Sequence, residues 1–156
     1  MAHAIIEVSM EGSHKKVQVI ITARDPEGSW SALILKTNKE RGQFWQNVTG
    51  SVDEGESFEA AALREAQEET GLEIENIVDF VSLEIPFEFK DRWKKQVHEE
   101  CFLIVAEEIW KPTIDASEHE NWKWVKLSDV SIDTFKYESN FISFEKARKM
   151  VLRMGL

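Results

Sequence analysis

The pattern of apolar and polar residues along the chain predicts β-strands in five segments and an extended conformation in a sixth, Gly42–Val48. Each segment gathers β-branched or aromatic residues between turn-forming residues, which is typical of strands. The segments are Lys16–Ala23, Ser31–Lys36, Gly42–Val48, Ile74–Phe89, Val97–Glu107 and Trp122–Leu127. The third segment is short, and the fourth is long enough to form either one strand or two.

Two further segments repeat apolar residues at the spacing of an amphipathic helix. Ser57–Thr70 begins with a residue that caps helices well, and Gly71 follows as a residue that ends them. Phe141–Met154 places its apolar residues three or four positions apart. The order of strands, helix, strands and helix predicts an α/β protein of the α+β type, with helices packed on a mixed sheet. With 156 residues, the chain is expected to form a single domain over residues 1–156.

The net negative charge of the chain argues against two classes of binding partner. The formal net charge is −10, and such a field repels nucleic-acid polymers and acidic membranes. Most of this charge is expected to keep the protein in solution. A phosphate substrate is an anion as well, so phosphate binding by this chain requires a cation.

Neither secretion nor disulfide chemistry is expected. The one cysteine, Cys101, cannot form an internal disulfide, and its apolar neighbours predict a thiol buried in a strand. Met1–Ala4 does not begin a signal peptide, and no apolar stretch approaches the ~18 residues of a membrane span. The cytoplasm is therefore the expected location.

The helix expected at Ser57–Thr70 carries three acidic residues close together. At about 100° per residue, Glu65, Glu68 and Glu69 fall within roughly a 100° arc, where like charges repel one another. A run of this kind is usually a solvated face. If the helix instead packs along its neighbouring alanines, the acids face a cleft, and clustered carboxylates bind hard divalent cations. The expected cofactor is Mg²⁺, with Mn²⁺ as the alternative.

The sequence around these acids resembles the Nudix box, G-x5-E-x7-R-E-U-x-E-E-x-G-U, in which U is aliphatic. The match runs from Gly50 through Glu56 and Arg64 to Leu72, and every specified position agrees. Seven fixed identities at fixed spacing arise by chance about once in 10⁷ starting points. The chain therefore resembles the Nudix hydrolases, and the resemblance implies a mixed β-sheet sandwiched between helices over nearly the whole chain.

The resemblance also implies roles for the charged residues of the box. Glu65, Glu68 and Glu69 match the metal ligands of the family, with Glu65 and Glu69 expected to hold the central Mg²⁺. Glu56 and Arg64 are expected to form a buried ion pair that fixes the loop and orients the acids. This pair and Glu68 are implied to support catalysis.

Other implied site residues lie outside the helix. Gly50 lets the backbone approach the metal, and the Thr49 carbonyl is an implied ligand. The stretches Phe44–Glu56 and Ser117–Trp124 resemble those of bacterial dihydroneopterin triphosphate diphosphatases, in which the acid before the histidine lies near the metals. Glu118 is therefore an implied metal ligand or general base. The rival proton acceptors are Glu99, Glu100, His98 and His119.

Four residues upstream of the box are expected to contact the substrate. Trp45 either stacks on a pterin or purine ring or packs in the core, and Gln46 follows it. Lys36 and Arg41 supply positive charge for phosphates, in a stretch that differs from its counterpart in the bacterial enzymes. A second basic patch, at Arg92–Lys95, is either a phosphate clamp or a solvated loop.

These features together predict a Mg²⁺-dependent hydrolase of a small phosphorylated metabolite. The expected substrate is dihydroneopterin triphosphate or a (deoxy)nucleoside triphosphate, and the products are a monophosphate and pyrophosphate. Water attacks one phosphorus with help from Glu118 or a box glutamate, because such transfers need mainly positioning and charge neutralisation. The alternatives are a Nudix hydrolase of another nucleoside diphosphate derivative, a non-catalytic Nudix-fold nucleotide sensor and a plain acidic scaffold. The oligomeric state considered is a homodimer.

Overall fold

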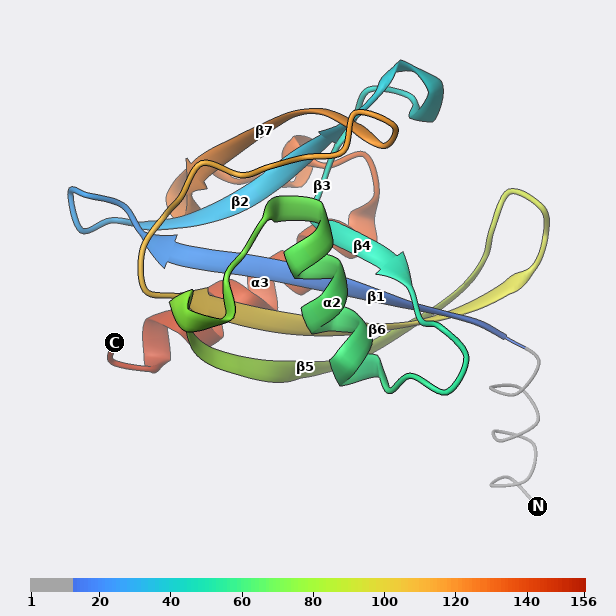
Figure 1. Ribbon diagram of the computed structural model, residues 1–156, viewed down its shortest axis with the longest axis horizontal. Coiled ribbons are helices and arrows are strands. Elements are labelled where there is room, and N and C mark those ends of the chain that lie inside the picture. Colours follow the sequence, from blue (N-terminus) through green and yellow to red (C-terminus); the bar gives the residue numbers. More distant parts are fainter. Residues whose placement is uncertain (1–12) are drawn as a thin grey trace.

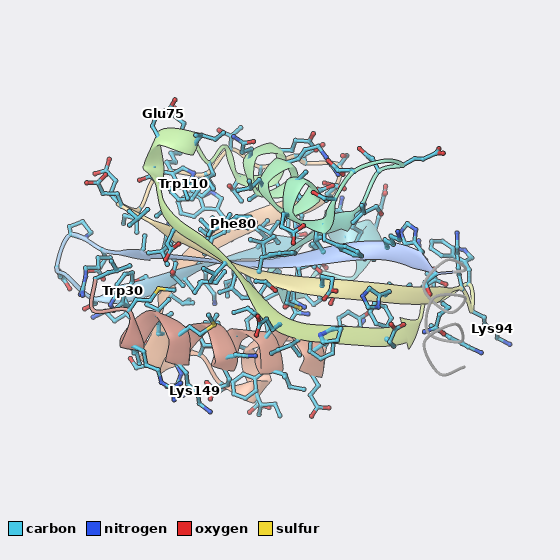
Figure 2. The ribbon with its side chains drawn as sticks, turned by 90° about the horizontal axis from the view of Figure 1, so that it is seen from below. Trp30, Glu75, Phe80, Lys94, Trp110 and Lys149 are labelled. Atoms are coloured by element: carbon cyan, nitrogen blue, oxygen red, sulfur yellow. The ribbon has the colours of Figure 1, made fainter. Side chains whose placement is uncertain are left out.

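The computed structural model describes residues 13–156, so Met1–Ala4 and their expected lack of a signal peptide lie outside the described residues. Helix α2 (Phe58–Thr70) lies on one face of a mixed β-sheet, and helix α3 (Glu138–Arg153) lies on the other (Figure 1). Seen from below, the sheet runs between the two helices as a middle layer (Figure 2). The predicted sandwich of a mixed sheet between helices is confirmed.

Seven strands form the sheet within residues 13–156. They are β1 (His14–Arg24), β2 (Trp30–Thr37), β3 (Trp45–Gln46), β4 (Val48–Ser51), β5 (Ile77–Lys90), β6 (Gln96–Ala106) and β7 (His119–Lys126). Strands β3, β2, β1, β6 and β5 follow one another across the sheet, while β4 pairs with β1 and β7 pairs with β2. The β1–β6 pair is parallel and the other pairs are antiparallel. Strands from distant parts of the sequence are therefore neighbours in the sheet, and residues from them lie on the same face of it.

The sheet divides the apolar core into two halves. Successive side chains of a strand point to opposite faces, so Val19 and Ile21 of β1 face α2, whereas Ile20 faces α3. Small residues of α2 complete the first half, namely Ala61, Ala62 and Ala66. Larger residues of α3 complete the second half, together with the buried thiol of Cys101 that the sequence predicted. The alanines let α2 lie close to the sheet.

Helix α2 begins and ends where the sequence predicted, to within one residue. The Ser57 side chain accepts a hydrogen bond from the Ala60 N–H, and Gly71 adopts a φ of 73° that favours glycine. Helix α3 begins at Glu138, three residues before the predicted Phe141. Single 3-10 turns connect the other elements, at Lys39–Arg41, Ile74–Asn76, Leu127–Asp129 and Ile132–Thr134.

The segment Gly42–Val48, for which the sequence suggested an extended conformation, contains β3 and the first residue of β4, which pair with different strands. Strand β3 pairs with β2, the chain breaks its pairing at Asn47, and β4 pairs with β1. The Asn47 N–H donates instead to Asn140 Oδ1 of α3 at 2.8 Å. A local pattern shows that a residue is extended, but not which strand lies beside it.

Two other strands differ from the prediction in detail. The stretch Ile74–Phe89 forms the single strand β5, which is irregular between Ser82 and Pro86. Strand β7 begins at His119 rather than Trp122, because a register shift between Lys36 and Thr37 of β2 brings His119 into the pairing. Within residues 13–156, no helix is both long and apolar enough to cross a membrane.

Candidate metal centre and active site

Helix α2 places its three acids in different surroundings. Glu69 is 5% exposed, and its Oε2 has no hydrogen-bond partner among the described residues. The side chain of Glu65 is 14% exposed, whereas that of Glu68 is 61% exposed. The three carboxylates of this face therefore differ in their exposure to solvent. A 100° arc is wide enough that Glu65 and Glu69 are covered while Glu68 lies in solvent.

The backbone of β4 passes directly beside the Glu65 carboxylate. A Cβ atom at Gly50 would lie 2.1 Å from Glu65 Cδ, so a glycine at this position leaves the carboxylate its place. The structure thus shows a close approach between the backbone at Gly50 and the Glu65 carboxylate. Thr49, whose carbonyl is a predicted ligand, precedes this glycine and lies opposite Gln18 of β1.

Arg64 joins the loop before α2 to the acids on the helix. Its Nε and one terminal nitrogen donate to the two oxygens of Glu56 at 2.8 and 2.9 Å. The other terminal nitrogen donates to Glu65 at 2.8 Å and to Glu68 at 3.2 Å. This fork matches the geometry of a carboxylate and fixes the position of Glu65. The arginine is a positioning residue for that acid.

The predicted ion pair between Glu56 and Arg64 is present, but it is not buried. The two side chains are 16% and 26% exposed, because residues 53–55 of the surrounding loop are themselves exposed. The hydrogen bond from Arg64 lowers the pKa of Glu56 to about 2, with a second contribution from the Asp53 N–H. Glu56 is therefore ionised at any pH at which the protein works.

The last turn of α2 meets the segment that leads into β7 (Figure 1). Glu69, Glu118 and His119 each place one donor atom within 4.8 Å of the other two. The Glu118 carbonyl accepts a hydrogen bond from the Asn38 N–H at 3.0 Å, which ties this segment to the turn after β2. Arg41 of the same turn donates to Glu118 Oε1 at 3.2 Å. We call Glu69, Glu118 and His119 the donor cluster.

Burial shifts the pKa values of Glu69 and His119 in the donor cluster. It raises the pKa of Glu69 to about 9, with further contributions from the negative charges of Glu65 and Glu118. Burial also raises the pKa of Glu65 and lowers the pKa of His119 to about 4. At neutral pH, Glu69 therefore holds a proton until a cation takes its place, and His119 is uncharged.

The residues of this site fit a divalent cation. Carboxylate oxygens from Glu65, Glu69 and Glu118 are the ligands that Mg²⁺ prefers. Buried polar atoms normally have a hydrogen-bond partner, yet Glu69 Oε2 and His119 Nδ1 have none among the described residues. A cation bound here would supply the partner that these atoms lack.

Two surface hollows of the molecule lie away from the donor cluster. One is lined by Trp30 and Arg148, and the other by Trp110 and Lys111. Neither is lined by Glu65, Glu68 or any residue of the donor cluster, so the cleft expected in front of the carboxylates is not one of them. The cluster is covered because Glu69 and His119 are both buried.

The fold and the arrangement of acids are those of one protein family. A family model described as the NUDIX domain matches residues 14–143, which is most of the chain. The chain belongs to the Nudix hydrolase family. The resemblance of residues 50–72 to the Nudix box is thereby confirmed.

Individual relatives match at modest identity. The dihydroneopterin triphosphate diphosphatase of Escherichia coli K12 is 36% identical over 58 residues, which are 37% of this chain and 36% of that protein. A protein named octanoyltransferase from Myxococcus xanthus is 33% identical over 108 residues, which are 69% of this chain and 29% of that protein. The solved E. coli dihydroneopterin triphosphate pyrophosphohydrolase has a TM-score of 0.71 and 26% identity, covering 85% of this chain and 92% of that chain. The chain thus spans about a third of the length of the two curated relatives.

Two of the four predicted substrate residues lie beside the Nudix box acids. Gln46 is 8% exposed, and its Nε2 lies 3.2 Å from His119 Nε2. Arg41 reaches the same place through its ion pair with Glu118. Both residues therefore adjoin the donor cluster, from β3 and from the turn after β2.

The other two predicted substrate residues lie on the α3 face of the sheet. Trp45 precedes Gln46 in β3 and points the opposite way, packing against the core half that faces α3. The Lys123 ammonium lies 4.3 Å from the centroid of its ring. Lys36 pairs with Glu120 at 3.5 Å. The structure does not bring Trp45 and Lys36 together with the donor cluster.

Of the four rival proton acceptors, His119 belongs to the donor cluster, whereas His98, Glu99 and Glu100 have partners elsewhere. His98 is buried, contacts Glu88 and places its Nε2 3.2 Å from Glu100. Glu99 is buried on the α3 face, where its Oε1 accepts a hydrogen bond from Gln18 at 3.0 Å. Among these acids, Glu118 is the one that lies with Glu69 and His119.

The sequence pattern ranked His119 low, although it is 1% exposed and belongs to the donor cluster. The burial of His119 could not be inferred from the alternation of residues. The register shift at Thr37 separates His119 from the alternating residues that begin at Trp122. A buried hydrogen-bond network between the sheet and α3 was also missed. Its members are Gln18, Asn47, Glu99, Asn140 and Ser143. Polar residues in strands give no pattern that distinguishes burial from exposure.

Proposed function

We propose that this Nudix protein is a Mg²⁺-dependent pyrophosphohydrolase. The proposed substrate is dihydroneopterin triphosphate or a (deoxy)nucleoside triphosphate, and the products are a monophosphate and pyrophosphate. One observation carries the proposal: Glu118 comes from a distant segment to lie with Glu69 and His119, and Glu69 Oε2 is buried without a hydrogen-bond partner among the described residues. The names of the E. coli relatives support the substrate class.

The proposed division of labour follows from the contacts within the site. When bound, Mg²⁺ neutralises the charge of the phosphates and lowers the pKa of water at the site. Glu65 and Glu69 hold the cation, and Arg64 keeps the Glu65 carboxylate in place through its 2.8 Å hydrogen bond. Glu118 accepts the proton of the attacking water. Glu68 is exposed, and we propose that it joins the site from the solvent side.

Arg41 has a part in this proposal because it neutralises Glu118 in the absence of substrate. Its side chain is 49% exposed, and its guanidinium lies 3.2 Å from the Glu118 carboxylate. An incoming phosphate competes for this guanidinium, since arginine binds phosphate and carboxylate in the same way. Substrate binding then releases Glu118 to act as a base.

The main alternative is a sensor that binds a nucleotide without hydrolysing it. Every specified residue of the Nudix box is retained, and the structure joins them through Arg64. A sensor needs no such arrangement, so hydrolysis is the better-supported function. We propose the cytoplasm as its setting, in keeping with the reduced, buried thiol of Cys101.

The test is a comparison of three substrates with Mg²⁺: dihydroneopterin triphosphate, dGTP and ADP-ribose. We expect pyrophosphate release from the two triphosphates, at a rate reduced at least 100-fold in Glu69→Gln. The matched control is Glu59→Gln, which makes the same change at an exposed position of the same helix. Binding of a triphosphate without any release of pyrophosphate would favour the sensor.

A further inference from the structure

His119 is a buried histidine with only one of its two ring nitrogens engaged. It opens β7 opposite Thr37 of β2, and 1% of its surface is exposed. Its Nε2 is engaged by Gln46 at 3.2 Å, whereas its Nδ1 has no hydrogen-bond partner among the described residues. A buried ring nitrogen without a partner is rare in folded proteins, so the second nitrogen calls for an explanation.

The second unpartnered atom lies in the same place. Glu69 is 5% exposed, and its Oε2 also lacks a partner among the described residues. Donor atoms of Glu69, Glu118 and His119 lie within 4.8 Å of one another, but no hydrogen bond joins the imidazole to either acid among the described contacts. Direct pairing does not satisfy these atoms, whereas a cation among them satisfies both at once.

Gln46 determines which ring nitrogen is available. The side-chain amide offers either its NH₂ or its oxygen to Nε2, depending on how the amide is turned. When the oxygen faces the ring, it accepts the Nε2–H hydrogen, and Nδ1 then carries a free lone pair. Histidines that bind metals usually donate their other N–H to an oxygen in this way.

We propose that His119 Nδ1 is a nitrogen ligand of the divalent cation, beside Glu69 and Glu118, with Gln46 holding the ring in the required tautomer. The role of this cation in hydrolysis rests on the proposed function. Mg²⁺ prefers oxygen ligands, whereas imidazole favours transition metals. The site therefore discriminates toward Mn²⁺ and Co²⁺ more strongly than a site made of carboxylates alone.

The test uses Mn²⁺ as a paramagnetic probe on the full chain. Pulsed EPR is recorded with unlabelled protein and with protein carrying ¹⁵N-histidine. We expect modulation from a directly bound imidazole nitrogen, which changes to the ¹⁵N pattern on labelling. The His119→Gln variant is expected to lose this signal, while His98→Gln, at another buried histidine of the same sheet, is expected to keep it. The labelled wild-type protein decides the question of nitrogen ligation even if a variant fails to fold.

A competition experiment measures the consequence for metal choice. We expect the ratio of Co²⁺ affinity to Mg²⁺ affinity to fall at least tenfold in His119→Gln, because a nitrogen ligand is lost. Bound Mn²⁺ without nitrogen coupling would overturn the inference, but Mg²⁺-dependent pyrophosphate release would then still support the proposed function. Absence of both Mn²⁺ binding and hydrolysis would overturn the two together.

Discussion

At the scale of single residues, the backbone at Gly50 lies so close to the Glu65 carboxylate that there is no room for a side chain at position 50. A methyl group there would lie 2.1 Å from Glu65 Cδ and 2.5 Å from Glu65 Oε1, so the carboxylate must move. Displacing a site group by about 1 Å commonly costs about 100-fold in rate. We therefore predict that Gly50→Ala lowers kcat/KM about 100-fold, measured by pyrophosphate release at saturating Mg²⁺.

The matched control for this change is Gly28→Ala. Gly28 has a φ of +86° and nothing within 4 Å of a new Cβ, so the substitution strains a remote turn without touching the site. We expect it to cost about 1 kcal/mol of stability and to leave activity unchanged. Equal losses of activity in the two variants would show that the space beside Glu65 is not the cause.

A second residue-scale prediction concerns the pH dependence of stability without metal. The pKa of Glu69 is about 9 in the folded protein, whereas the ordinary pKa of a glutamate is 4.5. Between these values the folded state holds a proton that the unfolded state has lost, so stability falls as pH rises. The lowered pKa of His119 acts in the opposite sense, but only below its ordinary value of 6.5.

Urea unfolding in EDTA from about pH 7 to about pH 8.5 isolates the Glu69 contribution. We expect wild type to lose up to about 1.4 kcal/mol per pH unit relative to Glu69→Gln, which cannot ionise at this position. Glu59→Gln, with its exposed carboxylate, is expected to keep the wild-type slope. Parallel slopes for wild type and Glu69→Gln would contradict a proton held by Glu69.

At the scale of elements, the boundary of α2 depends on one hydrogen bond at its start. Ser57 Oγ accepts from the Ala60 N–H at 3.0 Å, which satisfies one of the free donors of the first turn. We predict that Ser57→Ala lowers the free energy of unfolding by about 1 kcal/mol, measured by urea titration. Ser57→Asp retains an acceptor at the cap and should stay within about 0.5 kcal/mol of wild type. A neutral Ser57→Ala would mean that packing alone fixes the helix start.

The elements that the sequence predicted well are those whose ends are determined by residues close to them in the sequence. The ends of α2 follow from Ser57 and Gly71, which act within a turn of their own positions. The start of β7 was predicted three residues late, because His119 joins the sheet only through a register shift in β2. Asn47 likewise marks an exchange of partner strands rather than a turn. Such features depend on neighbouring strands, which a local pattern does not contain.

At the scale of the whole molecule, the site exists only because distant segments meet. The Nudix box supplies Glu65 and Glu69 within one helix, so sequence predicts their proximity directly. Glu118 reaches them through the pairing of β7 with β2, and Gln46 through the pairing of β3 with β2. The resemblance indicated Glu118, but nothing in the spacing showed which of Trp45 and Gln46 would face the acids.

Binding of a cation at this junction should stabilise the entire fold. A ligand at 100 times its Kd adds about 2.7 kcal/mol, which corresponds to a rise in Tm of roughly 5–10 °C for a chain of this size. We predict this rise on adding Mg²⁺ to wild type and to Glu59→Gln, followed by thermal denaturation. Glu69→Gln should lose most of it. An unchanged Tm in wild type at high Mg²⁺ would show that the donor cluster does not hold a cation.

The central claim is that the buried acids of the Nudix box make this chain a metal-dependent hydrolase. The most direct measurement is a Mg²⁺ titration of pyrophosphate release from dihydroneopterin triphosphate, for wild type and Glu69→Gln. We predict no release in EDTA, saturable activation by Mg²⁺ in wild type and at least a 100-fold loss in the variant. Release that persists in EDTA, or that survives in Glu69→Gln at the wild-type rate, would contradict this claim.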